Sequence, residues 1–156
     1  MKIGPFPLYR PDAGMIFEIT VGESDIFTLP LTDVSPGYLF KVYWGDGNSN
    51  TITSYDDVDK THVYTLAGNY NIKIDGLCAG FEFNDGGDKL KINKIISFGD
   101  IGLRRLNFFG CANLTTLPVE GEQLTQVETF FNCFSYCGAL TSIPEDLFKG
   151  NTVATD

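Results

Sequence analysis

Short runs of β-branched and aromatic residues recur along the first half of this chain, about ten residues apart, and turn-forming residues separate them. The turns include Gly22–Asp25, Ser35–Gly37 and Gly45–Asn48. Strands of this length and spacing are typical of two antiparallel sheets packed face to face. The sequence therefore predicts a mainly β fold, with strand-like runs at 16–21, 26–31, 39–44, 51–53, 61–65 and 70–75.

Alternation within these runs indicates which side chains form the core. Phe40, Val42 and Trp44 fall on one face of the run 39–44, because successive side chains of a strand point to opposite sides. The segment before the first run contains Pro5 and Pro7 and is predicted to be an extended arm over residues 1–14. The sandwich is then expected to span residues 15–83.

The second half of the chain contains an internal repeat. The segment Gly110–Pro118 recurs as Tyr136–Pro144, with Cys, Leu, Thr and Pro all displaced by 26 residues. A repeat of this length is typical of a solenoid. Residues 84–156 are predicted to form two to three repeats, open at the C-terminal end. Each Leu-Thr piece is expected to be a strand, and each Phe-rich piece, such as Thr129–Phe134, a turn of helix.

The first half carries a motif in three parts. Its order and spacing resemble the PKD domain, an Ig-like β-sandwich, over residues 15–76. The resemblance implies that these residues maintain the fold. They are Trp44, Gly45, Asp46 and Gly47, then His62 and Tyr64, then Gly68 and Tyr70.

The repeats resemble the BspA-like leucine-rich repeats of bacterial and phage surface proteins, over residues 90–150. In that family such modules are stalks, spacers or adhesive surfaces. The resemblance implies exposure and binding, and it implies no reaction.

Charge restricts the partners. The chain has 20 acidic and 11 basic residues and a formal net charge of -9. Such a field repels phosphate backbones, so nucleic acid is not an expected partner. No apolar stretch has the length of a signal peptide or of a transmembrane helix, and membrane insertion is not expected.

Residues with reactive side chains receive structural roles at this stage. Asp46 lies in a glycine turn, and no nucleophile or acid partner of His62 is visible, so no enzymatic activity is predicted. Asp56, Asp57 and Asp59 form an acidic loop and are weak Ca²⁺ candidates, although a solvated loop is the default reading. No other metal or cofactor is expected. The four cysteines are predicted to be buried thiols, and metal binding by Cys133 and Cys137 is the alternative.

These observations predict a non-enzymatic binding or structural module. Its expected partners are proteins of a larger assembly, and glycans are a further possibility. The candidate contact residues are Phe109, Phe131 and Tyr136, exposed aromatics of the repeats. The first hypothesis is a phage virion component in an oligomer or larger complex. The alternatives are a fragment of a bacterial cell-surface adhesin and an accessory domain of a secreted hydrolase.

Overall fold

The computed structural model describes residues 14–119 and 122–155, so all but the last residue of the predicted arm, 1–14, lies outside the described residues. The chain forms nine strands and two short 3-10 helices. The strands are β1 (Met15–Val21), β2 (Asp25–Thr28), β3 (Tyr38–Tyr43), β4 (Ser49–Ile52), β5 (Thr61–Tyr64), β6 (Gly68–Cys78), β7 (Gly80–Glu82), β8 (Ile92–Ser97) and β9 (Arg105–Asn107). The 3-10 helices are η1 (Val58–Lys60) and η2 (Glu122–Leu124).

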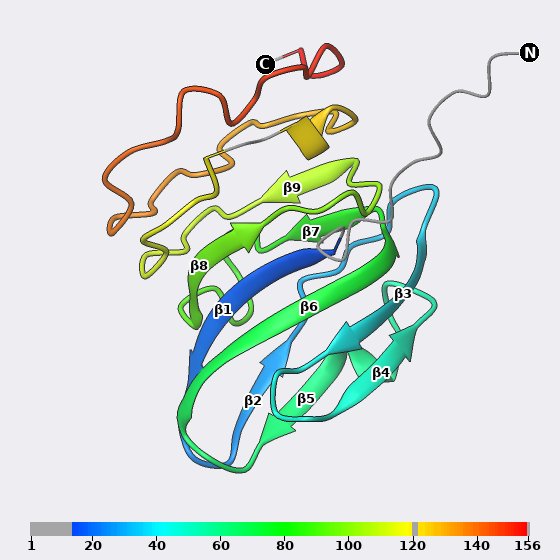
Figure 1. Ribbon diagram of the computed structural model, residues 1–156, viewed down its shortest axis with the longest axis vertical. Helices are drawn as coiled ribbons and strands as arrows, with labels where there is room; N and C mark the ends of the chain where they lie inside the picture. The colour runs from blue at the N-terminus through cyan, green and yellow to red at the C-terminus, as the bar shows by residue number, and fades with distance from the viewer. Residues whose placement is uncertain (1–13, 120–121, 156) are drawn as a thin grey trace, which may run out of the picture.

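The predicted mainly β fold is confirmed, and its largest part is a two-layer arrangement of antiparallel strands (Figure 1). One layer is a five-stranded sheet in the order β4-β3-β6-β1-β8, and the other is the pair β2-β5. Strands occur at all six predicted runs. β2 ends at Thr28, two residues before Pro30, because proline cannot donate a ladder hydrogen bond.

The core lies between the two layers. Side chains of β1 alternate, with Met15, Phe17 and Ile19 fully buried. The ring centroid of Phe17 lies 6.0 Å from that of Phe27 on β2, so the two layers meet through aromatic contact. Full burial of a large apolar side chain contributes roughly 2–3 kcal/mol, so a few such contacts are enough to fix how the layers stack.

The strands β7 and β9 lie beyond the sandwich and form a separate parallel pair. β8 follows β7 in the chain but returns to the large sheet, where it pairs with β1. The predicted boundary between residues 83 and 84 therefore precedes a strand of the five-stranded sheet. The same buried apolar cluster includes residues of β1, β8 and β9, so the core runs on past this boundary.

Three consecutive segments repeat the same turn, and we call residues 80–86, 105–111 and 131–137 the turn ladder. In each segment a phenylalanine carbonyl accepts the amide three residues later, at 2.8, 3.0 and 3.3 Å: Phe83 from Gly86, Phe108 from Cys111, and Phe134 from Cys137. The Phe108 and Phe134 rings stack at 5.7 Å and 4°. The predicted repeat is thus visible as repeated local geometry.

Backbone hydrogen bonds also join each segment of the turn ladder to the next. The amide of Phe83 donates to the carbonyl of Asn107 at 2.8 Å, and the amide of Phe108 donates to the carbonyl of Cys133 at 2.7 Å. The first segment begins at β7, before the residues in which the sequence repeat was recognised. A leucine-rich repeat solenoid as such stays a prediction.

Two local expectations for the repeats are wrong. The Phe-rich piece Thr129–Phe134 contains turns and no helix, and the Leu-Thr piece 114–117 forms an isolated bridge from Thr116 to Lys94 in place of a strand. The strand of this repeat is β9, in the Phe-rich piece that precedes Cys111. The physical reason is the side-by-side packing of the ladder segments, which favours extended backbone at their buried rings over a helical turn.

The segment after Pro144 covers the last segment of the turn ladder. Leu147 is fully buried, and the ring of Phe148 lies 4.5 Å from that of Phe130. The side chain amide of Asn151 donates to the carbonyls of Leu124 and Val127, at 2.6 and 2.9 Å. These contacts satisfy backbone carbonyls near η2.

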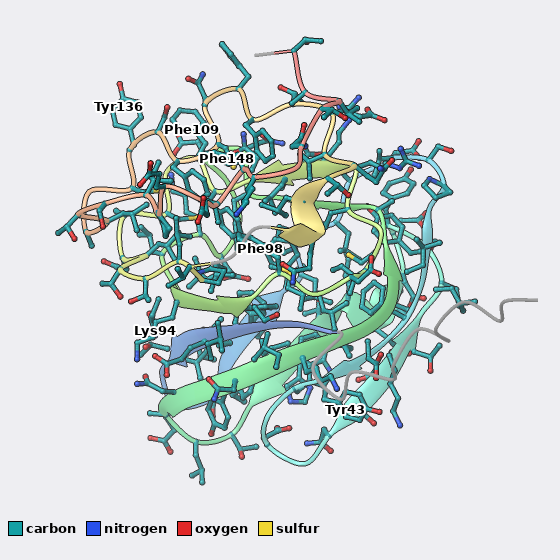
Figure 2. The ribbon with its side chains drawn as sticks, turned by 45° about the horizontal axis from the view of Figure 1, so that its top comes forward. Tyr43, Lys94, Phe98, Phe109, Tyr136 and Phe148 are labelled. Atoms are coloured by element: carbon teal, nitrogen blue, oxygen red, sulfur yellow. The ribbon has the colours of Figure 1, made fainter. Side chains whose placement is uncertain are left out.

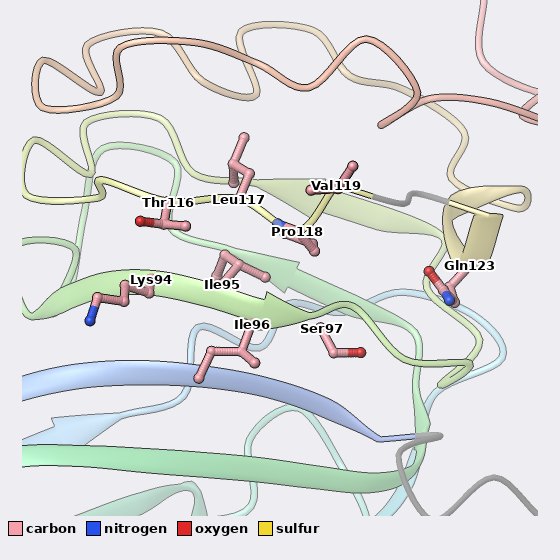
Figure 3. A pocket seen from close by; sticks show the side chains of 9 residues that line it. All are labelled: Lys94, Ile95, Ile96, Ser97, Thr116, Leu117, Pro118, Val119 and Gln123. Carbon is pink, nitrogen blue, oxygen red and sulfur yellow. The ribbon is translucent and has the colours of Figure 1, made fainter.

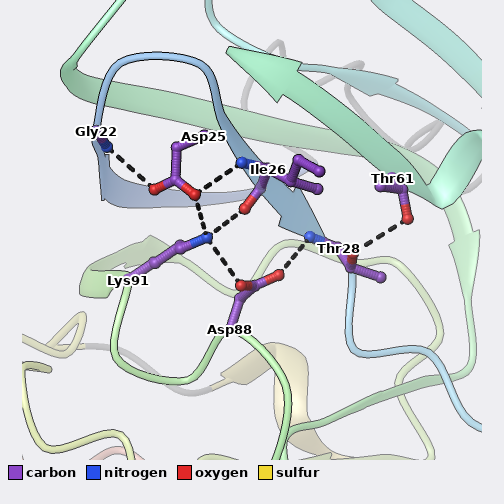
Figure 4. Close-up of polar contacts among 7 residues, drawn as sticks. All are labelled: Gly22, Asp25, Ile26, Thr28, Thr61, Asp88 and Lys91. Atoms are coloured by element: carbon purple, nitrogen blue, oxygen red, sulfur yellow. Dashed lines mark hydrogen bonds and ion pairs between the residues drawn. The ribbon is translucent and has the colours of Figure 1, made fainter.

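A group of ionic contacts ties β2 to the loop before β8 (Figure 4). We call Asp25, Asp88 and Lys91 the lysine clasp. The Lys91 ammonium lies 2.8 Å from the Asp25 carboxylate and 2.9 Å from that of Asp88. Asp88 also accepts the Thr28 amide at 2.8 Å. The clasp therefore fixes the start of β8 against β2, on which the turn ladder then builds.

Candidate functional site

The residues of the three-part motif surround Trp44 at the centre of the sandwich. The His62 ring stacks on the Trp44 ring at 4.8 Å and 8°, and Tyr64 meets His62 edge-on at 4.7 Å. Trp44 is fully buried, in agreement with its predicted core position. Its indole N–H donates to the side chain of Asn50 at 2.8 Å, which satisfies the polar atom of a buried ring.

Asp46 closes this group from the solvent side. Its carboxylate lies 2.8 Å from His62 Nε2 and accepts the Asn48 amide at 3.0 Å. Burial alone would raise the pKa of Asp46, but the hydrogen bonds from His62 and Asn48 outweigh it and lower the pKa. A carboxylate held in its ionised form between two partners is suited to a structural role in the turn.

Tyr64 completes the motif from inside the sandwich. Its hydroxyl donates to the Trp44 carbonyl at 2.8 Å, and its ring lies 4.4 Å from that of Tyr70. Burial raises the pKa of Tyr64 well above its ordinary value, so the hydroxyl stays protonated and keeps donating. The motif residues thus form one connected aromatic and hydrogen-bonded group.

The acidic loop uses its carboxylates locally. Asp57 precedes η1, and its carboxylate accepts the amides of Thr53 and Asp59, at 3.0 and 3.1 Å. Asp56 accepts the Ser54 hydroxyl at 2.7 Å. Throughout the described part of the chain, no three His, Cys, Asp or Glu side chains are grouped as metal ligands. The weak Ca²⁺ candidates Asp56, Asp57 and Asp59 are not brought together as a metal site.

All four cysteine side chains are buried, as predicted, with at most 7% exposure. Burial raises the pKa of Cys78 and Cys111 well above the ordinary range for thiols. The Cys137 thiol donates to the Phe108 carbonyl at 3.1 Å, between two segments of the turn ladder. These environments suit inert packing groups, because a reactive thiol needs a lowered pKa and access to solvent.

Two of the three predicted contact residues meet on the turn ladder. The Phe109 and Tyr136 rings lie 5.5 Å apart at 45°, and both project from the outer end of the molecule in Figure 2. They line a hollow of about 530 Å³, which we call the aromatic hollow. Its other lining residues are Asp85, Lys89, Leu90, Gly110 and Ala112.

The aromatic hollow has one apolar and one charged side. Lys89 forms an ion pair with the Asp85 carboxylate, and its ammonium also donates to the Asp85 carbonyl at 2.9 Å. Leu90 is 54% exposed and Tyr136 is 80% exposed. Sequence reasoning missed Asp85, Lys89 and Leu90. A signal existed, since counting 25 residues back from Gly110 leads to Asp85.

The same unusual backbone conformation occurs three times beside the aromatic hollow. Asp85, Gly110 and Tyr136 occupy equivalent positions of the turn ladder and have φ values of 63°, 80° and 58°. A side chain at Gly110 would overlap the Asp85 carboxylate. Glycine is therefore required at 110 by its conformation and by the close approach of Asp85.

The third predicted contact residue lies apart from this pair. Phe131 is 70% exposed but does not line the aromatic hollow. A second hollow, of about 500 Å³, lies between β8 and the segment 116–119 (Figure 3). Ile96 and Val119 line it and are 46% and 74% exposed.

Together these features define a mainly β protein with a structural aromatic cluster inside its sandwich and an exposed aromatic pair on its turn ladder. Comparison with protein-family models, with curated proteins and with solved structures finds no match to this chain. Among the residues described, no helix has the length and apolar character needed to span a membrane.

Proposed function

We propose that this chain is a non-enzymatic binding module displayed on a phage particle or a bacterial surface. The observation that carries the proposal is the exposed pair of Phe109 and Tyr136, which lie 5.5 Å apart on a hydrogen-bonded ladder. Rigid aromatic side chains that are exposed before binding are typical anchors of interfaces. The buried group around Trp44 would be the scaffold.

Local geometry supports the two resemblances. Trp44, Asp46, His62 and Tyr64 contact one another, as expected of motif residues that hold a PKD-like sandwich together. In the second half, Leu103, Leu106, Phe108 and Cys111 follow the spacing of a leucine-rich repeat around its strand, and β9 lies at that point. We propose that the turn ladder is a short array of this kind.

Binding is tested with the full chain, labelled and applied to immobilised glycans and to immobilised cell-surface and matrix proteins. We expect retention by at least one ligand, and at least tenfold weaker retention of Tyr136→Gly. Tyr55→Ser removes another exposed tyrosine, from the sandwich, and serves as the matched control. The absence of any retained ligand would contradict the proposal.

Assembly with further copies of the chain is a second candidate function, favoured by the hollow beside β8. This strand is an edge of the large sheet, and its parallel bridge to Thr116 is followed closely by Pro118, which has no amide to continue the pairing. An edge of this kind with exposed apolar neighbours favours strand addition. Light scattering after size exclusion should then detect an oligomer that Ile96→Lys disrupts, whereas a monomer at every concentration would exclude this candidate.

A further inference from the structure

Tyr136 occupies a position at which the backbone favours glycine. Its φ of 58° lies in the left-handed region, and the equivalent residue of the preceding segment is Gly110, at 80°. A bulky side chain with positive φ is strained relative to glycine. Asp85, the third equivalent residue, is of a type that tolerates this region.

Burial does not compensate Tyr136 for this strain. The residue is 80% exposed, the largest exposure of any aromatic side chain in the described part of the chain. Its ring contact with Phe109 orients it toward the aromatic hollow without removing it from solvent. Backbone strain that folding does not require points to function, because strained positions cluster at ligand-binding sites.

The charged side of the hollow restricts the chemistry of a ligand. The Lys89 ammonium and the Asp85 carboxylate neutralise each other, so an added cation would compete with Lys89 and an added anion with Asp85. The net charge of -9 further disfavours anions. A neutral ligand leaves the ion pair intact.

The hollow offers hydrogen bonds of both kinds beside an apolar wall. The ammonium of Lys89 donates and the carboxylate of Asp85 accepts, and a hydroxyl group can satisfy either. The rings of Phe109 and Tyr136 offer apolar faces. A saccharide has hydroxyl groups at its rim and C–H groups on its faces, and a hollow of about 530 Å³ lies within the size range of small-molecule sites.

We infer that the aromatic hollow binds a neutral saccharide, with Tyr136 as the stacking residue and Asp85 and Lys89 as hydrogen-bonding partners. This inference rests on the proposed binding function and specifies its ligand. Tyr136 is the residue that determines binding, because the fold itself would accept glycine there.

The test is an array of immobilised neutral, sialylated and sulfated glycans, probed with the labelled full chain. We expect retention on neutral glycans, a loss of at least tenfold for Tyr136→Gly, and an unchanged signal for Tyr55→Ser. Asp85→Asn keeps the shape of the side chain and its tolerance of positive φ but breaks the ion pair. It should weaken retention about three- to tenfold.

Stability separates a binding role of Tyr136 from a folding role. Tyr136→Gly should keep the melting temperature of the parent or raise it by about 1–4 °C, because the strain is relieved. A lowered melting temperature would show that Tyr136 serves the fold and would overturn the inference.

The glycan and protein arms distinguish the two proposals. Retention only on charged glycans would overturn the neutral-saccharide inference. Retention of a protein ligand through Tyr136, with no glycan bound, would also overturn it and would leave the binding function standing. Failure of both arms would remove the binding function itself.

Discussion

Asp46 shows how one side chain stabilises a turn and a core at once. Its carboxylate holds the Asn48 amide within the turn after Trp44, and it also holds His62 Nε2, which fixes the imidazole flat against the indole. The His62 side chain is 14% exposed, so water can replace its lost partner only in part. Asp46 thus links the turn to the aromatic group.

Asp46→Ala should lower the free energy of unfolding by about 1–2 kcal/mol, because it removes several hydrogen bonds around a half-buried imidazole. Asp46→Asn keeps an acceptor and should recover part of the loss. Urea unfolding followed by Trp44 fluorescence measures both, since Trp44 is the single tryptophan of the chain. Two variants as stable as the parent would show that the carboxylate is not needed.

At the scale of elements, the lysine clasp makes the docking of β8 dependent on pH. Hydrogen bonds from Lys91 and from the amides of Gly22 and Ile26 lower the pKa of Asp25 to about 2. Burial alone would lower the pKa of Lys91, but Asp25 and Asp88 outweigh it and raise the pKa. Both shifts favour the charged forms in the folded state.

The two shifts act at opposite ends of the pH scale. Because the pKa of Asp25 falls on folding, its contribution is complete above the ordinary value of 3.8 and is lost as the pH falls through about 2. Because the pKa of Lys91 rises on folding, its contribution is complete below the ordinary value of 10.5 and is lost as the pH rises through the folded value.

Lys91→Met should therefore cost about 1–2 kcal/mol of unfolding free energy at pH 7, with the difference from the parent shrinking toward pH 2. Urea titrations at intervals from pH 2 to pH 7 measure this difference. Lys149→Met removes an exposed lysine near the far end of the chain and should leave the pH profile unchanged. A constant difference across the range would mean that the clasp contributes through packing only.

The sandwich strands could be predicted from the sequence, and the placement of the repeat strands could not. β1 and β3 alternate between buried and exposed side chains, which is the signal that period-two reasoning detects. β7 and β9 have three residues each, too few for any period. Their pairing depends on segments 25 residues apart, so only tertiary contact identifies them.

The candidate site was predictable in the same uneven way. Phe109 and Tyr136 belong to recognised repeats, and their exposure followed from that. Asp85 and Lys89 lie in the Gly/Asp-rich stretch before Leu90, which resembles a linker in composition. Only the stacking of ladder segments brings this stretch beside Tyr136.

For the whole molecule, the shared core predicts cooperative unfolding. Phe108 in the turn ladder contacts the ring of Phe81, which in turn contacts Phe17 in the sandwich, at 5.9 and 5.2 Å. β8 also joins the large sheet directly. The two halves therefore lack the exposed linker that separates independent domains.

Phe108→Ala should lower stability by about 3–5 kcal/mol. The fluorescence of Trp44, which lies in the sandwich, should report this loss to the same extent as far-ultraviolet circular dichroism. Coincident transitions are the expected outcome. A Trp44 transition that stays at the midpoint of the parent, while the dichroism changes, would show two independent units.

The position of β1 between β6 and β8 also determines how the molecule would bear load. Its hydrogen bonds run across the strand, so a pull along β1 strains the whole seven-residue register with β6 together. A pull on the last ladder segment instead separates one set of contacts at a time. As a tether, the chain would resist tension at its β1 end and yield gradually at the other.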